Sequence, residues 1–392
     1  MRIIVGKERE SYEPELNFKD TSNRAQKWNV GPEHRKERET FCGCFGKRTP
    51  FLRLRAQLKT GCEPELNFRM RAITISATFF AQKINIYVNS TIHILFLTTL
   101  HIIFEKKETS MTQILDGKAL AGKIREELKH EVQQLSKSGV TPSLTVILVG
   151  EDPASQVYVR NKERAATEVG IHSNVIRLSE ETTQEELLEY VNTINHDASV
   201  HGILVQLPLP KHIDTDAVLE AIAPEKDVDG FHPVNLGKLL QKDESIVPCT
   251  PQGIMEFFKE YNIDLVGKEM VIIGQSTIVG RPMALLGLNH GATVTVCHSR
   301  TKDLAKVAKR ADILISAVGK AGLVTRDFVK EGAVVIDVGI NRNEAGKLCG
   351  DVLFEEVAPL TSAITPVPGG VGPMTIAMLL AQTVKNAKSK KE

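Results

Sequence analysis

From Met111 onward, short apolar runs alternate with longer segments in which apolar residues recur every three or four positions. Leu120, Ile124, Leu128 and Val132 follow the helical spacing and predict a helix over residues 119–137. The run "SLTVILVG", residues 143–150, is rich in β-branched residues and ends in glycine, which is typical of a buried strand. The same patterns predict further strands at 174–179, 200–210, 269–274, 293–299, 313–319 and 333–339, and further helices at 155–170, 182–197, 251–262, 280–291, 301–311 and 372–390.

This alternation predicts an α/β protein of two domains, each with a parallel sheet covered by helices. The first domain is expected over 111–250 and to be completed by the C-terminal helix within 370–392. The second is expected over 251–365. Ligands of such folds bind at the carboxyl ends of the strands, so we expect the site between the two domains.

Residues 1–110 differ from the rest in composition and pattern. The hexapeptide "EPELNF" occurs at 13–18 and again at 63–68, and the segment between is basic and irregular. The apolar stretch 91–104 is shorter than the ~20 residues that cross a bilayer. We expect Met111 to be the natural start and 1–110 to be translated upstream DNA or a disordered extension. A membrane-proximal arm is the alternative.

Composition excludes several functional classes. The formal net charge is +1, and only one Trp and five Tyr are present, which argues against a nucleic-acid or membrane surface. The six cysteines form no CxxC pair and no zinc-type cluster with histidine, so no metal is expected. They indicate reduced thiols in a cytoplasmic protein.

The segment "IIGQSTIVGRPMA" combines a strand, a glycine turn and the start of a helix, as in dinucleotide-binding sites. Gly274 and Gly280 suit the turn, while Ser276 stands where the usual fingerprint has its second glycine. An ordinary strand-to-helix turn is the alternative. The next predicted strand ends in "CHSRT" without an acidic residue, and Ser299 and Arg300 would suit the 2′-phosphate of NADP. A solvated basic turn is the simpler interpretation of Arg300 alone.

In "YVRNK", Tyr158 and Lys162 are four residues apart and would share one face of a helix. Such a pair can move protons, but a solvated helix face explains it equally well. Short-chain dehydrogenases have a Tyr-x-x-x-Lys pair downstream of the glycine-rich turn. Here it lies far upstream, which argues against that class.

Five strings occur together: "YVRNK", "VQLPLP", "KDVDGF", "GQSTIVGRP" and "PVPGGVGPMT". In this order they resemble the bifunctional methylenetetrahydrofolate dehydrogenase/cyclohydrolase (FolD) family, over essentially all of 111–392 and none of 1–110. The resemblance implies that 5,10-methylenetetrahydrofolate is oxidised with NADP⁺ to the methenyl cation, which water then opens to 10-formyltetrahydrofolate. It also implies a Rossmann-like NADP-binding second domain, folate derivatives as partners and a homodimer formed through that domain.

The resemblance assigns roles to individual residues. Lys162 corresponds to the catalytic lysine, Tyr158 to its partner that packs on the folate, Gln206 to the glutamine that binds the lysine, and Asp229 to the pterin-binding aspartate. Further folate contacts are implied at Val205, Leu207, Pro368, Gly369, Gly370, Val371, Gly372, Pro373, Met374, Thr375 and Ile376. Cofactor contacts are implied at Gly274, Gln275, Ser276, Gly280, Ser299, Arg300 and Ile340.

The chemistry of these residue types agrees with the roles. A carboxylate at Asp229 can accept two N–H donors from a 2-aminopyrimidinone edge, although an Asp-Gly turn residue is the plain alternative. A buried amine at Lys162, next to a cationic substrate, can act as a base toward water. Gln206 can orient that amine without adding charge, or can merely end a strand before Pro208. Glycines in "PGGVGP" let the backbone approach a planar ligand closely.

One position departs from the family pattern. Gln275 stands where the family usually has an arginine, so Arg300 and Arg281 would have to supply the charge for the 2′-phosphate. Two other functions stay open at this point: a shikimate-type NADP dehydrogenase, and a non-catalytic module that binds NADP or folate.

Overall fold

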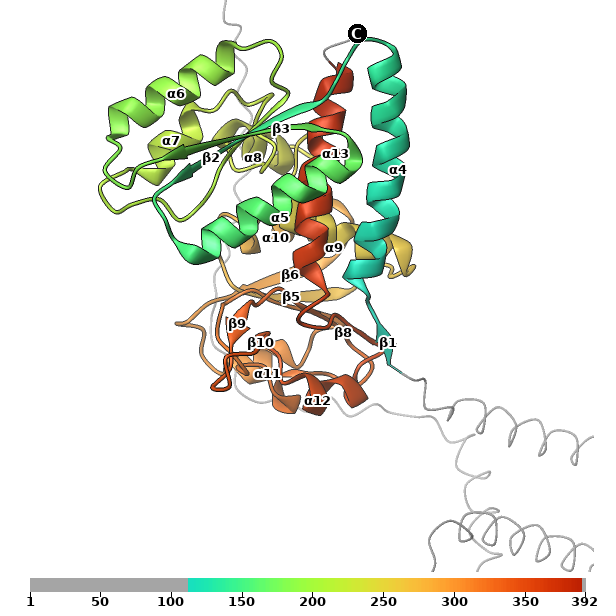
Figure 1. Cartoon of the computed structure of the whole chain (residues 1–392). Coiled ribbons are helices and arrows are strands. Elements are labelled where there is room, and N and C mark those ends of the chain that lie inside the picture. The colour runs from blue at the N-terminus through green and yellow to red at the C-terminus, as the bar shows by residue number, and fades with distance from the viewer. Residues whose placement is uncertain (1–111, 390–392) are drawn as a thin grey trace, which may run out of the picture. The chain divides into compact units, whose positions relative to one another are not determined.

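The computed structural model describes residues 112–389, and the predictions for 1–110 lie outside this range. Figure 1 shows a smaller sheet and a larger sheet, with the C-terminal helix α13 (Val371–Ser389, red) extending between them. The other helices are α4 (Gly117–Lys137), α5 (Pro153–Val169), α6 (Gln184–His196), α7 (Thr215–Ala221), α8 (Pro233–Leu240), α9 (Cys249–Glu260), α10 (Gly280–Asn289), α11 (Leu304–Ala308) and α12 (Phe354–Val357).

The smaller sheet consists of β2 (Ser143–Val149), β3 (His172–Leu178) and β4 (Gly202–Val205), all parallel, in the order β3-β2-β4. Alternate residues of β2 face different cores. Val146 and Leu148 pack among α4, α5 and α13, whereas Ile147 and Val149 pack toward α6 and α7. Because both faces are covered, the strand reads as a continuous apolar run rather than an alternation.

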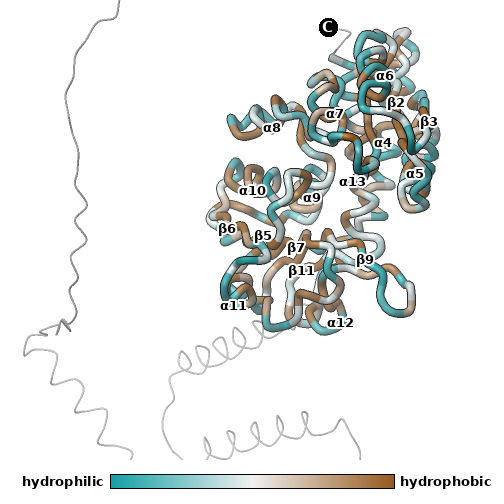
Figure 2. Tube along the Cα trace, turned by 90° about the vertical axis from the view of Figure 1, so that its left-hand side faces the viewer, coloured by the Kyte–Doolittle hydropathy of each residue, from teal (hydrophilic) through white to brown (hydrophobic). Residues whose placement is uncertain are grey.

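The larger sheet has six parallel strands in the order β1-β11-β8-β7-β5-β6. Figure 2 shows the strands β5, β7 and β11 in the colour of apolar residues, whereas the hairpin after β9 is hydrophilic. The strands are β1 (Gln113–Ile114), β5 (Glu269–Ile273), β6 (Thr293–Cys297), β7 (Ile313–Ser316), β8 (Val334–Asp337) and β11 (Ala363–Ile364), with the separate hairpin β9 (Asn341–Arg342) and β10 (Leu348–Cys349).

Local sequence signals set the ends of the catalytic helices. Asp152 caps α5 by accepting the Ser155 N–H at 2.7 Å, and Gly170 ends the helix in the left-handed region at φ 92°. Thr183 and Glu186 form the reciprocal capping box expected at the start of α6.

Helix α13 packs chiefly on α4 and α9 and also reaches α5 and the strands β2 and β4 of the smaller sheet. Close approach at its first turn requires small residues on the facing helices. A methyl group built onto Gly253 of α9 would lie 2.8 Å from Cβ of Met374. The C-terminal segment is therefore part of the core that it shares with α4 and α9, as its apolar pattern indicates.

Two details differ from the pattern-based predictions. Residues 113–114 pair with β11 and so join the larger sheet, although they precede the first predicted domain's helix. The helix predicted at 301–311 shortens to α11, because Asp303 adopts the left-handed conformation at φ 50° and interrupts the preceding turn.

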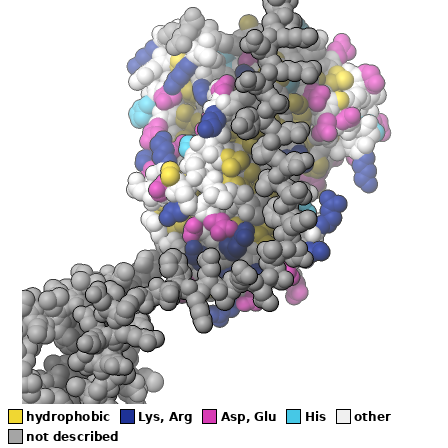
Figure 3. Space-filling model, turned by 180° about the vertical axis from the view of Figure 1, so that it is seen from behind, with side chains coloured by type: hydrophobic (Ala, Val, Ile, Leu, Met, Phe, Trp, Pro, Cys, Tyr) yellow, Lys and Arg dark blue, Asp and Glu magenta, His cyan; other side chains and the backbone are white. Residues whose placement is uncertain are grey.

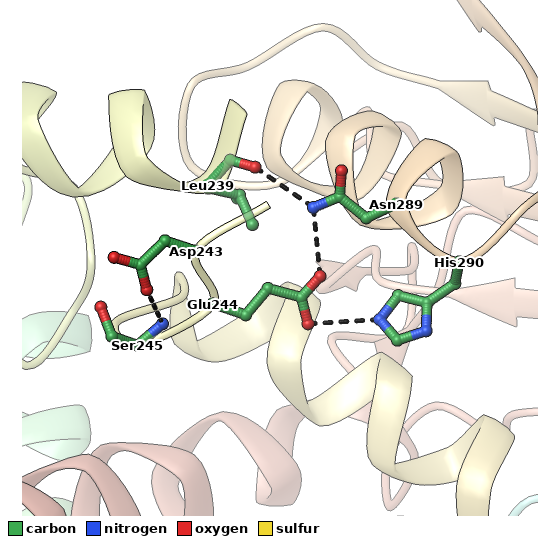
Figure 4. Close-up of polar contacts among 6 residues, drawn as sticks. All are labelled: Leu239, Asp243, Glu244, Ser245, Asn289 and His290. Atoms are coloured by element: carbon green, nitrogen blue, oxygen red, sulfur yellow. Dashed lines mark hydrogen bonds and ion pairs between the residues drawn. The ribbon is translucent and has the colours of Figure 1, made fainter. Parts of the chain in front are cut away.

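A polar link joins the segment after α8 to the end of α10 (Figure 4). The Asn289 side chain donates to the Leu239 carbonyl at 3.2 Å and to the Glu244 carboxylate at 3.1 Å, and His290 Nε2 lies 3.2 Å from the same carboxylate. The link therefore ties the connection between the sheets to the helix that follows the dinucleotide turn.

The part of the surface visible in Figure 3 intermixes basic and acidic side chains, in keeping with the nearly balanced charge. Within 112–389, no helix has the length and apolar character to cross a bilayer. The same residues contain no group of three or more His, Cys, Asp or Glu side chains arranged to hold a metal ion.

Candidate active site

Lys162 and Gln206 meet at the centre of the smaller domain. The lysine is on α5, is only 9% exposed, and donates from Nζ to Oε1 of Gln206 at 3.0 Å. The glutamine directly follows β4, where its own N–H continues the ladder to the Ile147 carbonyl at 2.8 Å. Its Nε2 donates to the Leu207 carbonyl at 2.6 Å, which leaves the amide oxygen facing the amine. The Gln206 amide thus holds the Lys162 amine in place by a hydrogen bond and, being neutral, adds no charge of its own.

Tyr158 lies one helical turn before Lys162 on the same helix. Its side chain is 40% exposed, in contrast to the buried lysine. A half-exposed aromatic ring beside a buried amine offers a flat surface on which a planar ligand could stack.

The two acidic residues of "KDVDG" have different environments. Asp227 is buried and accepts the N–H groups of Gly230 at 3.0 Å and His232 at 2.8 Å, together with Nδ2 of Asn235 at 3.0 Å. It therefore builds the turn itself. The carboxylate of Asp229 forms no hydrogen bond or ion pair with any residue of the described range, so it remains available to a ligand.

Both burial and neighbouring charges act on the Asp229 carboxyl. Burial raises the pKa of the Asp229 carboxyl to about 6, the positive charge of Lys162 lowers it, and Asp227 raises it. The carboxyl is partly exposed and yet desolvated on its protein side. A ligand with N–H donors would favour its ionised form.

Cys249 is a neighbour of this site that sequence reasoning treated only as a reduced thiol. It is buried at the start of α9, and its Sγ donates to the Val228 carbonyl at 3.1 Å. Burial raises the pKa of the thiol well above its usual range, and Asp229 raises it further. No local sequence signal indicates this proximity, because the contact joins residues 21 positions apart, with α8 between them.

The segment 368–376 is held against both neighbouring helices. The Lys118 N–H donates to the Gly369 carbonyl at 2.9 Å, and Gly369 has φ 103°. The hydroxyl groups of Thr250 and Thr375 lie 2.9 Å apart. The glycines therefore form an anchored loop rather than a free linker.

This loop reaches the larger sheet at Ile340. A methyl group built onto Gly372 would lie 3.9 Å from Cδ1 of Ile340, which follows β8 and is 49% exposed. The structure thus brings a predicted folate-side residue next to a predicted cofactor-side residue.

The dinucleotide turn follows β5. Gly274 has φ 129°, and a methyl group there would lie 2.4 Å from the Ala317 carbonyl oxygen; one on Gly280 would lie 2.1 Å from the Gly274 carbonyl oxygen. Ser276 Oγ accepts the Val279 N–H at 3.1 Å. The serine that replaces the second glycine therefore supports the turn. Residues 275–278 are exposed before α10, so the backbone there can approach a pyrophosphate closely. The turn fits a dinucleotide.

The predicted 2′-phosphate residues lie at the next strand end. Ser299 and Arg300 are exposed in a turn closed by the Thr301 N–H on the His298 carbonyl at 2.9 Å. Within the described part of the chain, no acidic side chain pairs with Arg300. Arg281 Nε donates to the Gln275 carbonyl at 3.1 Å, so a guanidinium stands beside the position that lacks the expected arginine.

The structure also has a cavity of about 460 Å³ between α9, α10 and the segment 263–266. None of its lining residues belongs to the predicted site, so we place the chemistry at the Lys162 cluster, where the buried amine and the desolvated carboxyl lie.

Comparison with known proteins decides the family. The model of the tetrahydrofolate dehydrogenase/cyclohydrolase catalytic domain matches residues 115–229, and that of the NAD(P)-binding domain of the same family matches residues 248–391. The chain belongs to the tetrahydrofolate dehydrogenase/cyclohydrolase family.

Individual relatives agree with this assignment. The bifunctional protein FolD of Streptococcus pneumoniae is 62% identical over 278 residues, which are 71% of this chain and 98% of the relative. The crystal structure of the bifunctional FolD enzyme from Campylobacter jejuni is 59% identical, with a TM-score of 0.71, and the match covers 71% of this chain and 99% of that one. The FolD enzyme of Trypanosoma brucei, solved with an NADP cofactor and an inhibitor, is 41% identical with a TM-score of 0.69 over 72% of this chain and 99% of that one.

These findings confirm the predicted family, the two-domain α/β fold and the bifunctional enzyme with a nicotinamide cofactor and folate substrates. They favour this function over a shikimate-type dehydrogenase and over a non-catalytic binding module. The individual site residues stay predictions.

Proposed function

We propose that this tetrahydrofolate dehydrogenase/cyclohydrolase oxidises 5,10-methylenetetrahydrofolate with NADP⁺ and then hydrolyses the methenyl product at the same site to 10-formyltetrahydrofolate. The observation that carries the proposal is the buried Lys162–Gln206 pair at 3.0 Å, next to the partly exposed Asp229 carboxyl. The proposed domain division has a catalytic domain over residues 111–250, completed by the helix within 370–392. The cofactor domain covers residues 251–365.

Asp229 orients the folate by accepting N–H donors of the aminopyrimidinone edge in a bidentate manner. Tyr158 packs on the ring system. Together with the loop 368–376 and the flanking Val205 and Leu207, these contacts set the one-carbon unit beside the lysine and toward the larger sheet. Orientation of this kind contributes to both reaction steps.

A nicotinamide cofactor, when bound, would supply the acceptor for a hydride from the methylene carbon and so leave that carbon electron-poor. Gly274, Ser276 and Gly280 would hold the pyrophosphate side, Ile340 would border the nicotinamide side, and Gln275 lies at the turn. Ser299 and Arg300 would contact the 2′-phosphate, with Arg281 as a second cation. This arrangement favours NADP over NAD.

In the second step, Lys162 acts as a general base. A cationic substrate favours the neutral amine, which removes a proton from water as the water oxygen bonds to the methenyl carbon. The bond from that carbon to ring nitrogen N5 then breaks: the nitrogen takes up the proton held by Lys162, the new hydroxyl group loses its proton to water, and the formyl group remains on N10. Gln206 holds the amine in place through its oxygen and is itself fixed by the Leu207 carbonyl.

We further propose a cytoplasmic homodimer that forms through the cofactor domain. Its support is the position of β6 as the last strand of the six-stranded sheet, with Val296 38% exposed on it. An unpaired strand edge is a suitable surface for a second copy. Sedimentation of the purified protein at two concentrations tests this assembly.

A paired assay tests the function itself. Dehydrogenase activity is followed with methylenetetrahydrofolate and either NADP⁺ or NAD⁺, and cyclohydrolase activity is followed as loss of supplied methenyltetrahydrofolate. We expect both activities, with a higher kcat/KM for NADP⁺. Folate binding without turnover would refute the proposal.

A further inference from the structure

Two buried carboxylates lie side by side behind the proposed nicotinamide site. Asp337 ends β8 and is 3% exposed, and Asp351 follows β10 and is fully buried. The Asp351 N–H donates to the Asp337 carboxylate at 3.0 Å. No Lys, Arg or His of the described residues forms an ion pair with either one.

Asp351 accepts hydrogen bonds from two separate segments of the chain. One carboxylate oxygen accepts the Ser316 hydroxyl at 3.0 Å and the Val318 N–H at 2.9 Å. The other accepts the Lys320 N–H at 2.8 Å and Nδ2 of Asn341 at 3.0 Å. A single side chain thus fixes the backbone after β7 and the start of β9.

Asp337 supports this arrangement from behind. Its carboxylate accepts the Gly339 N–H at 2.9 Å and the Val352 N–H at 2.9 Å. Glycine is required at both approaches: a methyl group on Gly339 would lie 2.2 Å from the Asp351 carboxylate, and one on Gly350 would lie 1.8 Å from that of Asp337. Each aspartate therefore packs against the glycine that lies next to the other one in the sequence: Asp351 against Gly339 of "DVG", and Asp337 against Gly350 of "GD".

Burial of two like charges is unfavourable, and burial raises the pKa of the Asp337 carboxyl to about 6. Uncharged side chains could hold these segments together at a lower desolvation free energy. The presence of two carboxylates therefore indicates that the backbone geometry they fix is important for function. The Asp351 carboxylate accepts four hydrogen bonds, which no apolar residue can do.

The fixed segments border the proposed cofactor. The Ala317 carbonyl, just before Val318, lies against Gly274 of the dinucleotide turn. Ile340, between the tied residues Gly339 and Asn341, lies next to Gly372 of the folate-side loop. The Asp351 contacts thus connect the two places where cofactor and substrate would meet, at the carboxyl ends of the central strands.

We propose that Asp351 is a positioning residue for the dehydrogenase step, which holds segment 317–320 and Ile340–Asn341 in the geometry that presents the nicotinamide to the folate. The inference rests on the proposed function, but it concerns only one of the two activities. Hydrolysis of supplied methenyltetrahydrofolate in the absence of NADP⁺ does not use these segments.

The test measures both activities in Asp351→Asn and Asn341→Ala. In the first variant an NH₂ group replaces one acceptor oxygen and faces backbone N–H donors. The second removes one donor without adding another. We expect dehydrogenase kcat/KM to fall at least tenfold in Asp351→Asn and severalfold in Asn341→Ala, with cyclohydrolase activity within twofold of wild type in both. Retained cyclohydrolase activity also shows that each variant folds.

Asp312→Asn is the matched control. Asp312 lies at the opposite, amino-terminal end of β7, where it accepts the Glu269 N–H at 2.9 Å and pairs with Lys330 at 2.7 Å. We expect it to reduce stability without changing the ratio of the two activities. An unchanged ratio in both test variants, whether the activities fall together or not at all, would overturn the inference. Wild-type protein without dehydrogenase turnover would instead refute the proposed function.

Discussion

Replacement of Lys162 by methionine removes the proposed base and keeps nearly the same length and volume. The amine is 9% exposed and its donation to Gln206 at 3.0 Å is its only hydrogen bond to the described residues. Loss of this bond leaves the half-buried amide oxygen of Gln206 without its partner, which costs at most about 1–3 kcal/mol, while removal of a buried charge offsets part of that amount. We therefore expect Lys162→Met to fold, with a change in unfolding free energy of about 2 kcal/mol or less.

Its effect on catalysis should be much larger. General-base catalysis contributes about 10²–10⁴-fold, or about 3–5 kcal/mol of barrier, so cyclohydrolase kcat should fall by that factor. Folate affinity should change by less than about tenfold, because Tyr158, Asp229 and the loop 368–376 remain. The positive charge of Lys162 lowers the pKa of Asp229, so its loss raises that pKa further and makes binding more sensitive to acid. Binding should therefore be compared at pH 8, where the carboxyl stays ionised in both proteins.

The assay follows loss of methenyltetrahydrofolate in single-turnover and steady-state mode, beside a direct measurement of the folate Kd. Lys123→Met is the matched control, because Lys123 is exposed on α4 and forms only a surface ion pair with Glu260 at 2.8 Å. It should keep full activity and nearly all of its stability, because an ion pair exposed to solvent stabilises the fold only weakly. If kcat/KM and affinity fell by the same factor in Lys162→Met, the lysine would only position substrate and the reasoning would be wrong.

Three further predictions concern other parts of the site. The Asp229 carboxyl has a pKa of about 6 and must be ionised to accept N–H donors. Cyclohydrolase kcat/KM should therefore fall about tenfold per pH unit below pH 6. A flat profile from pH 7 to 5 would contradict this role. Cyclohydrolase activity is the right measurement, since Asp337, with a similar pKa, belongs to the other domain. Gly280→Ala places a methyl group 2.1 Å from a backbone oxygen. It should reduce dehydrogenase activity at least tenfold, with cyclohydrolase activity retained. Gly122 has open space around it, so Gly122→Ala is the control and should change neither activity. Arg300→Ala should raise KM for NADP⁺ about tenfold with little change for NAD⁺, as expected for one charge-assisted phosphate contact; equal effects on both cofactors would exclude a 2′-phosphate role.

The sequence by itself determined the local structure and most of the candidate site. Apolar runs bounded by glycine predicted β2 and β5, and the Thr-x-x-Glu sequence at 183–186 is sufficient to cap the start of α6, because these features depend on neighbouring residues. The motif strings indicated the family and the candidate residues of the site. They could not show that Lys162 is buried, since a lysine on an amphipathic helix is normally expected to be solvated. Its burial depends on the contact with Gln206 at the end of β4, 44 positions later.

Tertiary structure decided what depends on contacts distant in sequence. β1 joins the larger sheet through pairing with β11, some 250 positions later, and two residues are too few to show a pattern. The spacing in "KDVDG" does not separate Asp227 from Asp229, yet the Asp227 carboxylate accepts hydrogen bonds within the turn, whereas the Asp229 carboxylate forms none with the described residues. In the sequence, Asp337 and Asp351 look like ordinary turn residues. The free energy of burying a carboxylate and the contacts it makes depend on which N–H donors the folded backbone brings to it. Local propensity has no access to that information, and only packing supplies it.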